Sequence, residues 1–312
     1  LPLLKMRKGK SDKRTLFRQE AETLLLSNGY YECYLYPFVS EEILKKCGYD
    51  PGERPRVVNP LNREMEYMNP EPLLGLVKAA ETNLKRGAGA VRLYEWSKAY
   101  PSFEGEEEVL SFLCAGEEPK TVYSPGHSLD YFNAKIIVDG LLKKTGAATI
   151  ERKESSRPVW APQTGFVYST QGEVLLETGL LRRDLASLYD IRQDVWGGYA
   201  RISPLTEMFR AGRSFVPFSP FPPVYYDLAF VVDASLPAGE MDREIVSQGG
   251  ALLEECRLFD RYEGDHLPRG KKSLAFSLTF RSRERTLTEK EIDDIIQKII
   301  ARMKKVFHAE LR

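Results

Sequence analysis

Basic side chains gather in one stretch of the sequence. Between residues 257 and 285 there are eight lysines and arginines against four acids, a local net charge of +4 in a chain whose formal net charge is zero. The eight are Arg257, Arg261, Arg269, Lys271, Lys272, Arg281, Arg283 and Arg285. Such a group can neutralise phosphates, which is the chemistry of nucleic-acid binding. It can equally keep the edge of a sheet soluble, and charge by itself favours this second interpretation.

Signatures of catalysis or metal binding are weak. The string 87–92 matches G-x-G-x-x-R, but it leaves a predicted helix and enters a strand, so we interpret it as a helix stop followed by a turn. The three histidines are far apart, and none adjoins a serine or cysteine motif that would pair a nucleophile with a base: His127, His266 and His308. The four cysteines lack C-x-x-C spacing, which predicts free thiols: Cys33, Cys47, Cys114 and Cys256. We therefore assign no catalytic residue, metal or cofactor to this chain.

Length and composition indicate a globular protein of two domains. The chain has 312 residues, of which 42% are hydrophobic and 29% charged. No apolar run approaches the roughly 20 residues that a membrane helix needs, and the first residues lack the apolar core of a signal peptide. We expect a cytoplasmic protein with no membrane segment.

The first two thirds of the chain predict an antiparallel sheet with flanking helices. Apolar side chains at helical spacing predict a helix over about 11–27, and aromatic residues then predict a strand over 30–38. Further helices are predicted at 72–86 and near 132–144, and further strands at 90–102, 109–117, 148–153, 167–168, 173–179 and 198–202, with a turn through 103–108. Short connections between strands make this an α+β domain, which we place at 1–207.

The last ninety-odd residues have a different order of elements. A proline-rich linker is predicted over 208–223, and β-α-β-β-α-β follows, the ferredoxin-like arrangement, in a domain placed at 218–312. In the final helix seven apolar residues from Ile292 to Val306 form one stripe, and Thr288 with Glu291 forms a capping box. In the preceding strand Leu274, Phe276, Leu278 and Phe280 alternate with Ser273, Ala275, Ser277 and Thr279. We expect the helices to cover the first set, leaving a face of small residues open.

These residues carry a resemblance to a known family. The strings "YDLAFVVD", "LFDRYEGDHLPRGKKSLAFSLTF" and "RERTLTEKEI" resemble the ferredoxin-fold anticodon-binding domain of the β subunit of bacterial phenylalanyl-tRNA synthetase. "VVNPLNREMEYMNPEPLLGLVKAAETNLKRGAGAVRLYEWSKAY" and "DYFNAKIIVDGLL" are similar to the class II synthetase-like module of the same subunit. Departures include "MNPE" at 68–71 in place of M-R-x-S, and Tyr225-Tyr226-Asp227, where an arginine is usual.

The resemblance implies a chain of phenylalanine–tRNA ligase that supports ATP-dependent aminoacylation without performing it. ATP and Mg²⁺ would belong to a catalytic α subunit, the expected partner together with tRNA, although a homodimer is also considered. The basic stretch then becomes an RNA-binding surface, with these candidates: Tyr226, Arg261, Tyr262, Lys271, Lys272, Arg281, Arg283 and Arg285. The first helix and strand stand where the family pairs its subunits, with these candidates: Leu16, Leu24, Leu25, Tyr34 and Tyr36.

Other functions stay open at this point. The chain could be a stand-alone paralogue that binds RNA, or a regulatory module that senses a small molecule. A single-chain synthetase of the organellar type is a further alternative, although no motif 3 arginine is found where that enzyme would need one. The sequence also leaves open whether this chain is part of a longer β subunit.

Overall fold

The computed structural model describes residues 12–312 except 104, 148, 211–216 and 265. Parts of four predicted elements lie outside the described residues: the start of the first helix, the 103–108 turn, the start of the 148–153 strand and the centre of the 208–223 linker. The chain divides into two compact units, Leu1–Arg213 (unit 1) and Ser214–Arg312 (unit 2). Each unit is described by itself.

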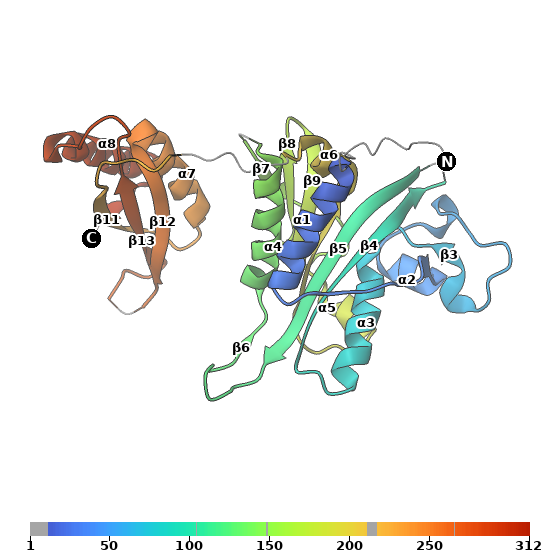
Figure 1. Cartoon of the computed structure of the whole chain (residues 1–312). Coiled ribbons are helices and arrows are strands. Elements are labelled where there is room, and N and C mark those ends of the chain that lie inside the picture. Colours follow the sequence, from blue (N-terminus) through green and yellow to red (C-terminus); the bar gives the residue numbers. More distant parts are fainter. Residues whose placement is uncertain (1–11, 104, 148, 211–216, 265) are drawn as a thin grey trace, which may run out of the picture. The chain divides into compact units, whose positions relative to one another are not determined.

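Unit 1 is built on an eight-stranded sheet in the order β1-β4-β5-β10-β9-β8-β7, with β6 paired to β5 (Figure 1). The strands are β1 Tyr31–Glu32, β4 Ala90–Ser102, β5 Gly105–Glu118, β6 His127–Ser128, β7 Glu151–Glu154, β8 Phe166–Thr170, β9 Glu173–Leu180 and β10 Val195–Arg201. Every pairing is antiparallel except that of β1 with β4. The predicted sheet is confirmed, with a parallel edge that the sequence did not indicate.

Helices cover both faces of this sheet. One face carries α1 Lys13–Ser27, α4 Tyr131–Thr145 and α6 Ile202–Met208, and the other carries α3 Leu73–Lys85 and α5 Arg183–Ser187. The run 110–115 explains why: Leu110, Phe112 and Cys114 pack under α1 and α4, whereas Leu113 and Ala115 pack under α3. A strand that is apolar on both sides needs cover on both sides.

The predicted strand over 30–38 is wrong as a single element. The chain forms β1, leaves the sheet, and pairs again only at β2 Phe38–Val39 with β3 Tyr67–Met68. Between them the N–H of Leu35 donates to the side-chain Oε1 of Glu95 at 2.6 Å, and Pro37 has no N–H to donate. The short helix α2 Glu41–Lys46, which follows, was missed because six residues are too few to show a helical stripe.

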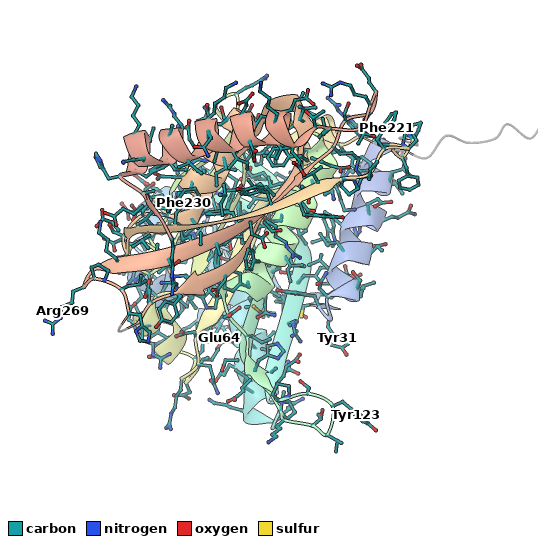
Figure 2. The ribbon with its side chains drawn as sticks, turned by 90° about the vertical axis from the view of Figure 1, so that its left-hand side faces the viewer. Tyr31, Glu64, Tyr123, Phe221, Phe230 and Arg269 are labelled. Atoms are coloured by element: carbon teal, nitrogen blue, oxygen red, sulfur yellow. The ribbon has the colours of Figure 1, made fainter. Side chains whose placement is uncertain are left out.

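Unit 2 has the predicted ferredoxin-like fold. Its elements are β11 Val224–Asp233, α7 Ala238–Gly249, β12 Leu253–Tyr262, β13 Lys271–Phe280, α8 Glu289–Phe307 and β14 Glu310–Leu311, with sheet order β12-β13-β11-β14. Helices α7 and α8 pack together and against one face, where Phe230 of β11 lies in the core (Figure 2). The core side of β13 is as expected, because Leu274, Phe276, Leu278 and Phe280 are fully buried. The other side is less open than expected, because Ser273 and Ala275 are buried as well.

The capping box of α8 is confirmed and includes an arginine. Oε2 of Glu291 accepts hydrogen bonds from the backbone N–H of Thr288 at 3.0 Å and from its hydroxyl at 2.8 Å. It also accepts one from Nη1 of Arg285 at 2.7 Å. The Arg285 guanidinium and then the Thr288 N–H lower the pKa of the Glu291 carboxyl to about 2. The start of α8 therefore prefers an ionised Glu291.

Glu291→Gln should lower the melting temperature near pH 6, and the deficit should shrink as the pH falls from about 4.5 towards 2. The depressed pKa stabilises the fold above the ordinary carboxyl pKa, and this contribution is lost as Glu291 takes up its proton. The measurement is thermal unfolding of both chains at pH 6 and pH 3.5. Glu289→Gln, in the same first turn but outside the capping box, is the control, and a Glu291→Gln deficit of equal size at both pH values would contradict the account.

Candidate nucleic-acid interface and pairing surface

The face of the unit 2 sheet opposite α7 and α8 is lined by small side chains along its centre. The register pairs Thr279 with Tyr225, Ser277 with Asp227 and Ala275 with Ala229 across β11. On the other side of β13, Ser273 pairs with Tyr262 and Ser277 with Arg257 of β12. We call this side the small-residue face. It combines a shallow centre with aromatic and charged margins.

The C-terminal arginine reaches across this face. The backbone N–H of Arg312 donates to the carbonyl of Ala229 on β11 at 2.9 Å, and its guanidinium lies 5.5 Å from the ring centroid of Tyr262 on β12. Strand β13 lies between those two strands, and on this face Ser273 pairs with Tyr262 and Ala275 with Ala229. Ser273 and Ala275 are only 4% and 9% exposed although neither α7 nor α8 covers them. Sequence reasoning missed Arg312, since only the tertiary pairing of β14 with β11 brings it here.

Most of the predicted cations already have partners inside unit 2. Ion pairs join Arg261 to Glu263 (2.6 Å), Lys271 to Asp233 (3.2 Å) and Arg281 to Glu254 (2.9 Å), and Arg285 binds Glu291. Three further arginines are exposed: Arg257, Arg269 and Arg283. Figure 2 shows Arg269 extending outwards from the loop between β12 and β13. The paired cations remain at the surface of unit 2, but each ion pair fixes the position of its cationic side chain.

Three of the predicted RNA contacts lie on the wrong side of the sheet, and one of them is Arg261, which pairs with the buried Leu274. Lys272 is 6% exposed, and its ammonium donates to the carbonyl of Ala234 at 2.8 Å, so it cannot reach a phosphate. Tyr226 pairs with Leu278 and therefore belongs to the helix-covered side, at whose margin it is 36% exposed. Its neighbour Tyr225 faces the small-residue side and is 70% exposed.

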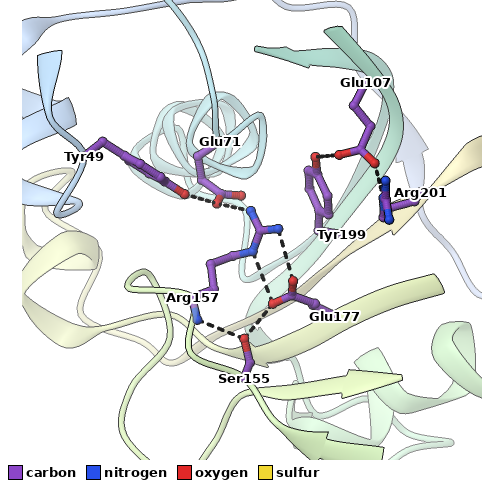
Figure 3. A network of polar contacts seen from close by, with 8 residues as sticks. All are labelled: Tyr49, Glu71, Glu107, Ser155, Arg157, Glu177, Tyr199 and Arg201. Atoms are coloured by element: carbon purple, nitrogen blue, oxygen red, sulfur yellow. Dashed lines mark hydrogen bonds and ion pairs between the residues drawn. The ribbon is translucent and has the colours of Figure 1, made fainter. Parts of the chain in front are cut away.

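Unit 1 contains a buried polar network on the α3 side of its sheet (Figure 3). Arg157, in the loop after β7, donates from Nη1 to Oε2 of Glu71 at 2.8 Å and from Nη2 and Nε to the two oxygens of Glu177 at 3.1 and 3.2 Å. The Tyr49 hydroxyl donates to Oε2 of Glu71 at 3.0 Å, and the Ser155 hydroxyl donates to Oε2 of Glu177 at 2.6 Å. Residues from three separate segments are thereby tied to β9.

The charges of this network pair with one another, although Oε1 of Glu71 is buried without a hydrogen-bond partner among the described residues. Glu71 is fully buried, and the Arg157 guanidinium lies 4.4 Å from the ring centroid of Tyr199 on β10. Burial acts to lower the pKa of Arg157, but Glu71 and Glu177 outweigh it and raise that pKa. An arginine held in this way is a cross-link. Its N–H groups face carboxylates, where a phosphate clamp would present them to a ligand.

The predicted pairing residues separate into internal and exposed ones. Leu25 is fully buried in the core of unit 1, so its prediction is wrong, and Leu16 and Leu24 are partly buried against the same core. Leu24 occupies the space that a side chain at Gly140 of α4 would need. Tyr34 and Tyr36, in contrast, are 82% and 75% exposed. Tyr31 (Figure 2) and Leu26, which were not predicted, are also exposed.

Two protein-family profiles match this chain, one for each unit. The profile described as "Phenylalanyl tRNA synthetase beta chain CLM domain" matches residues 1–197, and "Ferredoxin-fold anticodon binding domain" matches residues 219–312. The chain belongs to the phenylalanyl-tRNA synthetase β-chain family. The resemblance in the sequence and the predicted ferredoxin-like domain are thus confirmed.

Curated relatives of this β-chain family align along nearly all of the chain. The phenylalanine–tRNA ligase β subunit of Clostridium acetobutylicum is 29% identical over 98% of this chain and 39% of its own length. That of Geobacillus kaustophilus is 30% identical over 95% and 37%. The chain therefore spans about two fifths of the length of these relatives. Pyrrolysyl-tRNA synthetase from Desulfitobacterium hafniense covers 62% of this chain and 67% of its own with 11% identity and a TM-score of 0.48, a likeness too weak to add to the assignment.

The described part of this β-type chain contains neither a membrane-spanning helix nor a cluster of metal-binding side chains. No helix in that part of the chain combines the length and apolar character needed to cross a bilayer. The same residues contain no group of three or more histidine, cysteine, aspartate or glutamate side chains placed to hold a metal ion.

Glu71→Ala should destabilise unit 1 by about 3–5 kcal/mol, because it leaves the buried Arg157 guanidinium with one of its two carboxylates missing. Urea unfolding followed by tryptophan fluorescence measures this, since all three tryptophans lie in unit 1. Lys78→Ala breaks the exposed pair with Glu64 and should cost less than about 1 kcal/mol. Equal effects of the two substitutions would show that the network contributes no more than a surface pair.

Proposed function

We propose that the chain acts as a non-catalytic β-type chain of phenylalanine–tRNA ligase, within the cytoplasm, binding the anticodon region of tRNA through unit 2 and pairing with a catalytic α subunit through unit 1. ATP and Mg²⁺ are then bound by the α subunit. The observation that carries the proposal is the small-residue face, which neither α7 nor α8 covers and on which the Arg312 guanidinium contacts the Tyr262 ring. The family membership of both units supports it.

The small-residue face suits an unpaired RNA loop. Single-stranded bases are bound by stacking on aromatic rings and guanidinium planes, and phosphates by cations around them. Tyr225 offers an exposed ring, and Tyr262 with Arg312 offers a ring and a guanidinium already in contact. Ser277 and Thr279 of β13 are partly exposed, and their small side chains let a base approach the sheet closely. Arg257, Arg269 and Arg283 remain exposed for the RNA backbone, and Tyr226, Arg261 and Lys272 are left out of the proposed set.

We assign no catalytic role to the chain because arginines of unit 1 that could bind ATP are paired with carboxylates of the same unit. The string 87–92 is, as interpreted, the end of α3 and the entry to β4, where Gly87 has φ +95°. Arg92, which ends that string, pairs with Glu118. Arg157 is occupied by carboxylates on the same side of the sheet as α3. These arginines support a structural role for the synthetase-like unit.

Tyr262→Ala should weaken binding of a tRNA(Phe) anticodon stem–loop by about tenfold or more, the loss expected for one base–aromatic stack. Filter binding of the full chain at two salt concentrations measures it, and the affinity of the wild type should fall steeply with salt because phosphate contacts release counterions. Lys304→Ala, on the exposed side of α8, is the control. No RNA affinity, or an affinity indifferent to salt, would instead favour the small-molecule regulatory alternative.

Tyr34→Asp combined with Tyr36→Asp should abolish or strongly weaken pairing with a co-expressed α subunit, because two charges would be desolvated where the proposed interface buries two rings that are exposed in the chain alone. Co-purification and sedimentation velocity measure the complex. Val58→Asp, at a residue that is 91% exposed outside this segment, should pair normally. A double variant that pairs as tightly as wild type would refute the pairing surface, and self-association in place of pairing would indicate a homodimer.

A further inference from the structure

The segment that presents Tyr34 and Tyr36 is attached to the sheet in an unusual way. Strand β1 runs parallel to β4, and the N–H of Cys33 donates to the carbonyl of Tyr94 at 2.7 Å. In a continuing parallel ladder the N–H of Leu35 would bind the next carbonyl along β4. It binds the side chain of Glu95 instead, at 2.6 Å. A carboxylate thus turns the chain away from the sheet.

This hydrogen bond decides which side chains face outwards. Leu35 points inwards, packing against the core under α3 and against Gly75, whose missing side chain leaves room for its methyl group. Its two neighbours, Tyr34 and Tyr36, are therefore exposed. Beyond them the carbonyl of Pro37 accepts from the N–H of Asn69 at 3.0 Å, which fixes the far end of the segment. Between these anchors, Glu95 is the only described residue seen to hydrogen-bond the backbone of the segment.

The surroundings of Glu95 bring the pKa of its carboxyl close to neutral pH. Glu95 is 6% exposed, and burial raises the pKa of its carboxyl to about 7, against the smaller opposite effects of the Leu35 N–H and Ser97. Polar groups facing it are the Cys33 thiol of the segment, Ser97 of β4 and Ser111 of β5, with the Tyr199 phenol of β10 one strand further. Burial raises the pKa of the Cys33 thiol and of the Tyr199 phenol too, so both stay neutral. None of these groups supplies a compensating cation.

We propose that Glu95 is a positioning residue for subunit pairing: its ionised carboxylate, by holding the N–H of Leu35, sets the outward presentation of Tyr34 and Tyr36, and pairing weakens when Glu95 takes up a proton. The inference rests on the pairing surface proposed above. An ionised acceptor makes the stronger hydrogen bond, so protonation loosens the segment. Pairing should therefore tighten between pH 6 and pH 8.

Folding stability should move in the opposite direction. A carboxyl whose pKa is raised on folding stabilises the fold below the ordinary carboxyl pKa of about 4.5, and this contribution is lost as the pH rises through about 7. A residue with a merely structural role would change pairing and stability together. Opposite pH trends for the two quantities are the signature of positioning by Glu95.

The test compares the full chain with Glu95→Gln in sedimentation against a co-expressed α subunit at pH 6 and pH 8. Glutamine keeps an acceptor oxygen but not the charge, so the variant should pair about fivefold more weakly than wild type at pH 8 and show no change between the two pH values. Glu95→Leu, which removes the acceptor, should pair more weakly still. Glu32→Gln, at a partly exposed carboxylate on β1 that pairs with Arg18, is the matched control and should behave as wild type.

Two results separate this inference from the function on which it rests. If Tyr34→Asp with Tyr36→Asp weakens pairing but Glu95→Gln pairs as tightly as wild type at pH 8, positioning by Glu95 is overturned and the pairing surface stands. If the tyrosine variant pairs normally, the pairing surface itself fails. Pairing of the wild type that is the same at pH 6 and pH 8 would likewise overturn the role of Glu95.

Discussion

Helices cover both faces of the sheet in unit 1 and one face of the sheet in unit 2, and this difference determines where each unit can meet a partner. It originates in the side chains of single strands. β5 is apolar on both sides, with Phe112 and Leu113 buried in different cores, whereas β13 alternates large apolar residues with serine, alanine and threonine. The first pattern demands two layers of helices, and the second is satisfied by one.

Ion pairs within each unit limit which charged side chains are free to meet a partner. The net charge of zero conceals a basic stretch, yet several of its cations bind carboxylates of unit 2, among them Arg261, Arg281 and Arg285. In unit 1 a cation is paired in the same way but in the protein interior, where Arg157 binds Glu71 and Glu177. Glu95 differs, since it is buried with a backbone N–H as its partner. That difference is why its charge can vary near neutral pH.

Elements with a long regular pattern of apolar residues could be predicted from the sequence. Elements whose ends depend on contacts with distant residues could not. The nineteen-residue helix α8 and the alternation of β13 could be identified because one stripe or face is uniformly apolar. The same alternation could have excluded two candidates: Tyr226 has the parity of Leu228, and Lys272 that of Leu274. The break after β1 could not be predicted, because it depends on Glu95, which lies sixty residues away. Arg312 reaches its place through a pairing of the two chain ends of unit 2, which no local pattern indicates.

The most direct test of the central claim is photo-cross-linking of the full chain to a tRNA(Phe) anticodon stem–loop that carries 4-thiouridine in its loop, followed by peptide mapping. The account predicts adducts on β11, β12 and β13 and at the C-terminus, with Tyr225, Tyr262 or Arg312 within the modified peptides. Adducts confined to the helices α7 and α8 would contradict it, because those helices cover the opposite side of the sheet.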